Sequence, residues 1–156
     1  MSTKLSASET SIVIVVSEFN KPIIENLLQG ALDAFAHHGG KESDIQIYRV
    51  PGAFEIPGTI QQIMKFHNPQ AIIALGAIIR GETPHFDYIA GESTKGIAEI
   101  SRSSNIPIIN GIVTTDNAKQ ANDRSQVGGR NKGWDAMETA LQTIVVYQEI
   151  FSASKC

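Results

Sequence analysis

Residues 71–79 read Ala-Ile-Ile-Ala-Leu-Gly-Ala-Ile-Ile, an almost unbroken apolar run. A second run, Ile12-Val-Ile-Val-Val16, has the same character. A strand with one face in water alternates apolar and polar residues, whereas a strand buried on both faces is apolar throughout. These two runs therefore predict the central strands of a parallel β-sheet that is covered by helices on both faces.

The rest of the chain supplies the partners that such a sheet needs. Further β-type runs cover residues 45–50 and 106–113, and the stretches between the runs have helical spacing. The predicted helices cover residues 22–38, 55–66, 86–104, 118–123 and 131–151. Because strands and helices alternate four times, the sequence predicts an α/β fold with right-handed crossovers.

Composition limits the classes of protein that remain. With 42% hydrophobic and 19% charged residues over 156 positions, the chain is globular rather than disordered. We expect an N-terminal arm at residues 1–10 and a single domain at 11–156. The net charge of −3 and the lack of a dense basic run argue against nucleic-acid and anionic-membrane partners.

Compartment and covalent chemistry follow from what the sequence lacks. The single cysteine, Cys156, has no partner for an internal disulfide or a thiolate zinc site. No apolar run reaches about 18 residues, and the first ten residues lack the apolar core of a secretory signal. We therefore expect a soluble, cytoplasmic protein.

Ligands of parallel α/β folds lie at the carboxyl ends of the strands, so the loops there are the places to look for chemistry. After the first strand, Phe19 offers a ring for stacking and Asn20 a donor and an acceptor; the alternative is a helix cap with a packed aromatic. After the second strand, the amides of Ala53, Phe54 and Glu55 stand at a helix start and can donate to a ligand. The alternative there is an ordinary strand-to-helix turn.

The loop after the third strand is the richest. Gly81, Glu82 and Thr83 precede a helix, so their backbone N–H groups can form a nest for an anion. His85 follows at the same mouth, and histidine is the usual proton shuttle near neutral pH. The other histidines, His37, His38 and His67, are interpreted as structural.

The chain after the fourth strand is basic and rich in glycine. Thr115 or Asp116 suits the N-cap of the following helix. Further on, Arg124, Arg130 and Lys132 stand among glycines. Each charge taken alone is best interpreted as solvated, but together they could close over a phosphate.

Several common fingerprints are missing. The sequence has no GxxxxGK[ST] loop, no GxGxxG after the first strand, no metal-ligand spacing and no GxSxG elbow. The residues alone therefore predict a metal-free α/β protein with an anion nest, one acid/base histidine and an aromatic wall.

Five blocks then occur in order and carry a resemblance. They are Phe19-Asn20, Pro51-Gly-Ala-Phe-Glu-Ile-Pro57, Gly76-x-x-Ile-Arg-Gly-Glu-Thr-x-His-Phe-Asp87, Gly111-Ile-Val-Thr-Thr115 and Asn131-Lys-Gly133. The chain resembles the 6,7-dimethyl-8-ribityllumazine synthase family of riboflavin biosynthesis over roughly residues 11–150. The block after the third strand is its most specific part.

The resemblance implies a fold and a reaction. The fold is a flavodoxin-like sandwich whose four parallel strands run in the order 2-1-3-4, with helices on both faces. The reaction is a cofactor-free transferase reaction in which 5-amino-6-ribitylaminouracil condenses with 3,4-dihydroxy-2-butanone 4-phosphate. The partners are these two small molecules and further copies of the chain, in a homopentamer with active sites between adjacent subunits.

The resemblance also implies roles for residues. Phe19 would stack on the pyrimidine ring beside Asn20, Ala53 and Glu55 would bind the ribityl chain near Phe54, and His85 would move protons. The backbones of Ile78 and Ile79 would line the pyrimidine pocket, and those of Gly81, Glu82 and Thr83 would hold the phosphate. Arg124, as phosphate partner, and Lys132 would come from the neighbouring subunit.

Two departures from the family pattern are visible. Asn110 stands where the family often has an aromatic pocket residue, so it either faces the ligand or turns away and caps the strand end. Residues 126–131 read Gln-Val-Gly-Gly-Arg-Asn where shell-forming members often read Gly-Thr-Lys-x-Gly-Asn. A larger icosahedral shell and a non-catalytic, flavin-binding or shell-forming relative are the alternatives.

Overall fold

Four parallel strands in the order β2-β1-β3-β4 form the central sheet of the computed structural model, which describes residues 5–81 and 85–154. The strands are β1 (Ile12–Ser17), β2 (Ile45–Val50), β3 (Ala71–Ile79) and β4 (Ile108–Thr115). This confirms the predicted fold class and strand order. β4 begins two residues later than predicted, after Pro107, which has no N–H to donate to a strand partner.

The two central strands divide the core into two halves. Every residue of β1 and of β3 is buried. Along β1, Ile12, Ile14 and Val16 enter one core, while Val13 and Val15 enter the other. This alternation follows from the period of two in a strand, and it explains why these two runs are apolar at every position.

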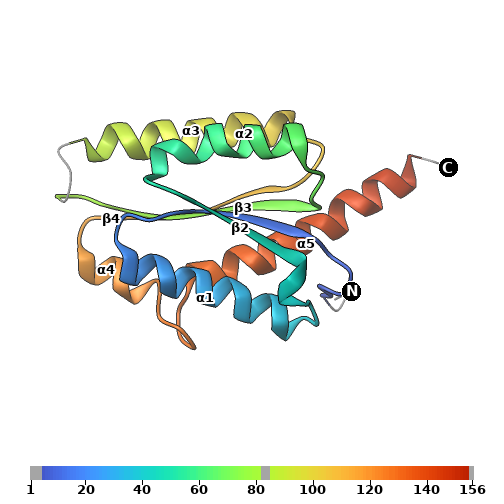
Figure 1. The fold of residues 1–156 in the computed structure, drawn as a ribbon, viewed down its shortest axis with the longest axis horizontal. Helices are drawn as coiled ribbons and strands as arrows, with labels where there is room; N and C mark the ends of the chain where they lie inside the picture. Colours follow the sequence, from blue (N-terminus) through green and yellow to red (C-terminus); the bar gives the residue numbers. More distant parts are fainter. Residues whose placement is uncertain (1–4, 82–84, 155–156) are drawn as a thin grey trace.

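Helices cover both faces of the sheet (Figure 1). On one face lie α1 (Lys21–His37), α4 (Ala118–Asp123) and α5 (Lys132–Ala153). On the other face lie α2 (Ile56–Phe66) and α3 (Phe86–Ser103). Two short 3₁₀ turns, η1 (Glu42–Asp44) and η2 (Ala53–Glu55), flank β2. The five predicted helices are therefore confirmed, with bounds that shift by at most two residues.

Helix α5 crosses α1 at very close range. A Cβ atom on Gly133 would lie 1.9 Å from the Leu27 carbonyl oxygen, so the position admits only glycine. Asn131 caps α5, because its Oδ1 accepts from the Trp134 amide at 3.0 Å and its Nδ2 donates to the Asn26 carbonyl at 3.0 Å. The last turn before α5 is therefore fixed directly against α1.

The N-cap of α4 differs from the prediction. Asn117 caps this helix through a bond from the Gln120 amide at 2.9 Å, rather than Thr115 or Asp116. Thr115 is still part of β4 and is buried, and the carboxylate of Asp116 bonds to Arg80 instead. Both predicted residues are thus occupied by tertiary contacts that the local pattern does not contain.

The first described residues pack beside the end of α1, whereas the last turns of α5 project away from the sheet. Ala7 is buried, and its amide donates to the His38 carbonyl at 2.8 Å just after α1. The end of α5 projects beyond the sheet (Figure 1), where Ile150 and Phe151 are exposed. Over the described residues, no helix has the length and apolar character needed to cross a membrane.

Candidate functional site at the carboxyl edge of the sheet

The predicted site loops meet at one edge of the sheet. Ser17 pairs with Val50 and Ile79 pairs with Thr115, while Val16 pairs with Leu75, so β3 and β4 extend about three residues beyond the ends of β1 and β2 at this edge. Because the strands are parallel, the segments that follow them leave the sheet on the same side. The structure therefore brings together Phe19, Asn20, Ala53, Phe54, Glu55, Gly81 and His85 from three separate loops.

The first loop presents an open ring and a bonded amide. Phe19 is 55% exposed, so its ring is available for stacking. Asn20 occupies the N-cap position of α1 in a left-handed conformation with φ of 67°, but its side chain makes no cap bond. Instead its Nδ2 donates to the Ala77 carbonyl of β3 at 3.4 Å. Asn20 thus ties the first loop to the strand that leads to His85.

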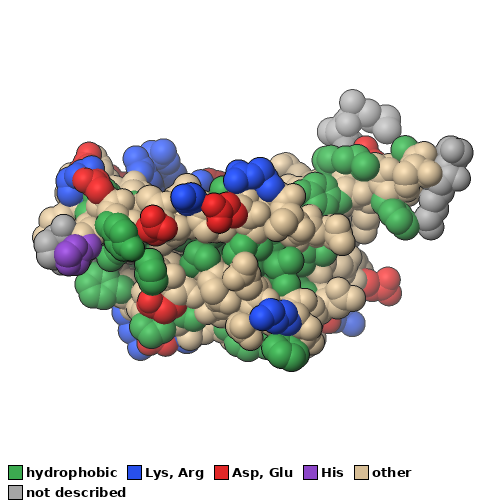
Figure 2. Space-filling view, turned by 90° about the horizontal axis from the view of Figure 1, so that it is seen from above, with side chains coloured by type: hydrophobic (Ala, Val, Ile, Leu, Met, Phe, Trp, Pro, Cys, Tyr) green, Lys and Arg blue, Asp and Glu red, His purple; other side chains and the backbone are tan. Residues whose placement is uncertain are grey.

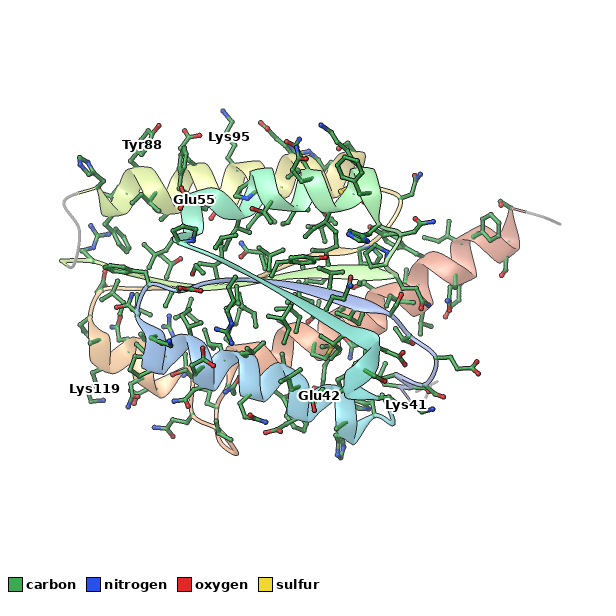
Figure 3. The ribbon with its side chains drawn as sticks, viewed as in Figure 1. Lys41, Glu42, Glu55, Tyr88, Lys95 and Lys119 are labelled. Carbon is green, nitrogen blue, oxygen red and sulfur yellow. The ribbon has the colours of Figure 1, made fainter. Side chains whose placement is uncertain are left out.

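The second loop is built on η2. Ala53 is buried, while Phe54 is about half exposed and stacks on Tyr88 of α3, with 6.3 Å between ring centroids and 18° between planes. Figure 3 shows Glu55 and Tyr88 at the same end of the layer formed by α2 and α3. A groove of about 580 Å³ continues from there between the two helices, lined by Phe54, Glu55, Pro57, Gly58, Thr59, Gln62, Glu92 and Gly96.

The third loop leaves the sheet after two buried isoleucines. The side chain of Ile78 enters one core and that of Ile79 the other, so these residues can offer a ligand only their backbone. Gly81 has φ of +91°, a left-handed conformation that favours glycine. Glu82 and Thr83, predicted to hold an anion, lie outside the described residues. His85 is exposed immediately before the first turn of α3.

One residue of this loop received no role from the sequence. Arg80 donates from Nε to Asp116 at 3.0 Å, lies 3.4 Å from Asp87, and places its guanidinium 4.4 Å from the Phe86 ring centroid. It therefore fastens the end of β3 to the first turn of α3 and to the segment after β4. Its position between Ile79 and Gly81 in the most specific block was the available signal.

A second arginine near this edge is also held by a carboxylate. Arg49 of β2 donates from Nη1 to Glu25 of α1 at 2.6 Å. This hydrogen bond raises the pKa of the Arg49 guanidinium. Arg49 therefore stays charged and fixes α1 against the edge strand.

Asn110 does not lie at the carboxyl edge of its own sheet. It is exposed on β4 and pairs with Ala74. It precedes Thr115 by five positions, about 17 Å along the strand at ~3.3 Å per residue. Its Oδ1 accepts from the Ile112 amide at 3.0 Å.

The basic residues predicted at the site form a separate group. Arg124 and Lys132 line a pocket of about 390 Å³ at the edge strand β4. Arg124 follows α4 and Lys132 begins α5, and both helices cover the face of the sheet opposite α3. Figure 3 shows the two layers, with Lys119 of α4 on one side of the sheet and Tyr88 of α3 on the other. One chain therefore presents an aromatic and backbone-donor half and a cationic half, at different places.

The fold defines a class: an α/β sandwich of flavodoxin-like architecture, in which the carboxyl edge of the sheet is the candidate small-molecule site. Within the described ranges, no group of three or more histidine, cysteine or acidic side chains has the arrangement of a metal site.

Comparison with known proteins gives the particular family. The family described as 6,7-dimethyl-8-ribityllumazine synthase matches residues 9–148. A 6,7-dimethyl-8-ribityllumazine synthase of Chlorobium limicola is 46% identical over 145 residues, which cover 93% of this chain and 94% of the relative. One of Chlorobium luteolum is 44% identical over 146 residues, 94% of each chain. The chain therefore belongs to the 6,7-dimethyl-8-ribityllumazine synthase family, whose members are enzymes of riboflavin biosynthesis.

Proposed function

We propose that the chain condenses 5-amino-6-ribitylaminouracil with 3,4-dihydroxy-2-butanone 4-phosphate to give 6,7-dimethyl-8-ribityllumazine, phosphate and water. The observation that carries this proposal is the meeting of distant sequence blocks at one edge. Residues 19–20, 53–55 and 81–85 belong to blocks that resemble the family, and they follow three neighbouring strands of one sheet.

Each half of the substrate pair has a matching group. The exposed ring of Phe19 stacks on the flat pyrimidine, with Asn20 beside it. The amides and carboxylate of residues 53–55 bind the hydroxyls of the ribityl chain, and the backbones of Ile78 and Ile79 border the ring. The phosphate lies against the amides of residues 81–83 and the Arg124 guanidinium, whose planar fork suits phosphate oxygens.

The chemistry asks little of the protein beyond positioning. An amine of the pyrimidine attacks the ketone to form an imine with loss of water, phosphate leaves, and the ring closes with loss of a second water. His85 moves the protons of these steps. Holding two reactants together is worth up to roughly 7–11 kcal/mol in ideal cases, so positioning supplies most of the rate enhancement.

The proposal includes an assembly in which two copies complete each site. Support comes from the separation of the cationic pocket, at the edge strand β4, from His85, at the start of α3. An adjacent copy contributes Arg124, Lys132 and Asn110 to the pocket formed by the carboxyl edge, as in the homopentamer that the resemblance implies. Because one substrate carries a charged phosphate ester that crosses membranes poorly, the proposal places the reaction in the cytoplasm.

The test is a single sample assayed and sized. Purified protein is mixed with both substrates while lumazine absorbance is followed, and the same preparation is analysed by light scattering. We expect absorbance to rise and the mass to equal at least five chains. A sample that binds riboflavin but shows no turnover would establish the non-catalytic alternative, and an active monomer would exclude the shared site.

A further inference from the structure

The pocket at the edge strand β4 carries more positive charge than the proposed roles use. It is lined by Ile112, Val113, Thr114, Arg124, Arg130, Lys132 and Asp135. Three cationic side chains and one carboxylate share a volume of about 390 Å³. Arg130 has no role in the proposed function.

A short hairpin fixes the three cationic positions against one another. Ser125 and Asn131 form an antiparallel bridge, and the Gln126 amide donates to the Arg130 carbonyl at 3.0 Å. The Lys132 amide donates to the Arg124 carbonyl at 2.8 Å. The backbone thus holds three like charges together, an arrangement that is unfavourable until an anion neutralises it.

The charges in this pocket have no carboxylate partners in the part of the chain that the structure describes. None of Arg124, Arg130 and Lys132 forms an ion pair there within 4.0 Å, and the one side-chain hydrogen bond among them runs from Arg124 Nη1 to the Thr114 carbonyl at 3.4 Å. Arg49 and Arg80, by contrast, have carboxylates at 2.6 and 3.0 Å. The pocket cations are therefore available to a ligand.

We infer that Arg130 is a second guanidinium of a phosphate-binding pocket, acting with Arg124 and Lys132 on a phosphate dianion. Two guanidinium groups offer a dianion more parallel N–H donors than one. The assignment of that dianion as the phosphate of the butanone substrate rests on the proposed function. The inference that the pocket binds a phosphate group is independent of the proposed function.

The sequence of the hairpin agrees with this role. Residue 128 is glycine, with φ of +79°, at the position where shell-forming members of the family often have lysine. Arg130 stands two positions later, where those members often have glycine. The hairpin therefore retains one cation beyond Arg124 and Lys132, at a different position.

The first experiment measures phosphate binding without turnover. Full-length protein in its native assembly is titrated with inorganic phosphate by calorimetry, as wild type, Arg130→Gln and Lys119→Gln. Lys119 is an exposed cation of neighbouring α4 that pairs with Asp123, so its loss controls for net charge. We expect Arg130→Gln to weaken the phosphate Kd about 5- to 10-fold, just below the range of about 10- to 150-fold for a charge-assisted bond, because the site is open. We expect Lys119→Gln to change it less than 2-fold by general electrostatics.

The second experiment assigns the phosphate to the substrate. In steady-state assays, Arg130→Gln should raise KM for the butanone phosphate by a similar factor and leave kcat and the pyrimidine KM near the wild-type values. An unchanged phosphate Kd would overturn the inference. A weakened phosphate Kd with an unchanged butanone-phosphate KM would overturn the substrate assignment.

A third variant and the activity of the wild type distinguish failure of the phosphate pocket from failure of the proposed function. Arg130→Lys should restore part of the phosphate affinity, because the charge remains and the fork is lost. If the wild type shows no synthase activity but phosphate binding still depends on Arg130, the proposed function fails and the phosphate pocket stands. If Arg130→Gln and Lys119→Gln weaken binding equally, the pocket is only a region of positive potential and the inference fails.

Discussion

At the scale of single residues, His85 is the one ionisable side chain of the aromatic half that is proposed to move protons. General acid–base catalysis is typically worth about 10²–10⁴-fold, and an easy condensation lies at the low end. We expect His85→Ala to lower kcat about 10²-fold without changing the assembly size, and to flatten the pH–rate profile. His67→Ala is the control, because that histidine ends α2 at the opposite edge of the sheet. A His85→Ala enzyme with the wild-type rate across the pH range would remove His85 from the mechanism.

Substitution of Arg124 is expected to change the KM of one substrate much more than that of the other. A hydrogen bond between charged groups is worth about 1.5–3 kcal/mol, or about 10- to 150-fold in affinity. We expect Arg124→Ala to raise KM for the butanone phosphate within that range and the pyrimidine KM much less, with Arg124→Lys intermediate. Arg102→Ala, at the exposed end of α3, provides the comparison. An equal rise in both KM values would contradict the assignment.

The contacts of Arg80 are expected to contribute to both stability and activity. Its contacts with Asp116, Asp87 and the Phe86 ring are partly exposed, so the whole cluster is worth about 1 kcal/mol of unfolding free energy. We expect Arg80→Met to lose about that amount in urea unfolding and to lower kcat several-fold, because the first turn of α3 carries His85. A double-mutant cycle with Asp116→Asn should show coupling of about 0.3–1 kcal/mol. Strict additivity would mean that the contact between Arg80 and Asp116 contributes nothing.

At the scale of elements, the crossing of α1 and α5 positions the cationic half. A Cβ atom on Gly133 would collide with the Leu27 carbonyl, which is backbone and cannot rotate away. Overpacking of this kind costs about 1–3 kcal/mol. Because the collision is with backbone, we expect Gly133→Ala to reduce the free energy of unfolding by about 3 kcal/mol or more. We also expect it to weaken phosphate binding, since Lys132 and the hairpin move with α5.

A second glycine provides the matched control for this prediction. Gly91 lies inside α3, and a Cβ atom there would meet nothing within 4 Å in the chain as described. Because alanine is about 1 kcal/mol better than glycine within a helix, Gly91→Ala should be neutral or stabilising to unfolding. If Gly133→Ala were equally well tolerated, the close crossing would not be what holds the hairpin in place.

At the scale of the whole molecule, the two halves of the proposed site lie apart, one at the carboxyl edge of the sheet and one beside the edge strand β4. Figure 2 shows the α2 and α3 side, where hydrophobic and charged side chains are scattered among other residues. The exposed rings of Phe54, Phe66 and Tyr88 belong to this layer or its ends. In the assembly proposed above, each copy would complete the site of its neighbour.

Complementation between variants tests this arrangement. We expect His85→Ala and Arg124→Ala each to be nearly inactive at low butanone phosphate, and co-expression should restore activity at about a quarter of the sites by random mixing of copies. Co-expressing His85→Ala with His85→Asn is the control and should restore none. Recovery is measured by lumazine absorbance on purified mixed assemblies. A lack of recovery in assemblies shown to be mixed would place both residues in one chain's site.

The sequence predicted the fold more fully than the arrangement of the residues near the candidate site. The strands and helices follow from periodicity, and Pro22, Pro57 and Asn131 mark helix starts where the structure has them. The cap of α4 was predicted at the wrong residue, because Asp116 bonds to Arg80, 36 positions away. A local sequence pattern reflects only interactions between neighbouring residues. A side chain that bonds to a distant residue, as Asp116 does, therefore does not take the position that the local pattern predicts.

The sequence by itself determined the sheet, its buried centre and the residue types of the site, because hydrophobic periodicity and short blocks are written along the chain. Only the tertiary structure decided how those residues are distributed in space. It gathered Phe19, the residues of η2 and His85 at one edge, left Asn110 about 17 Å from the end of its strand, and put the cationic hairpin beside the edge strand β4. The physical reason is that the crossover connections and the glycine crossing of α1 and α5 set these distances, and both depend on contacts between residues far apart in the sequence.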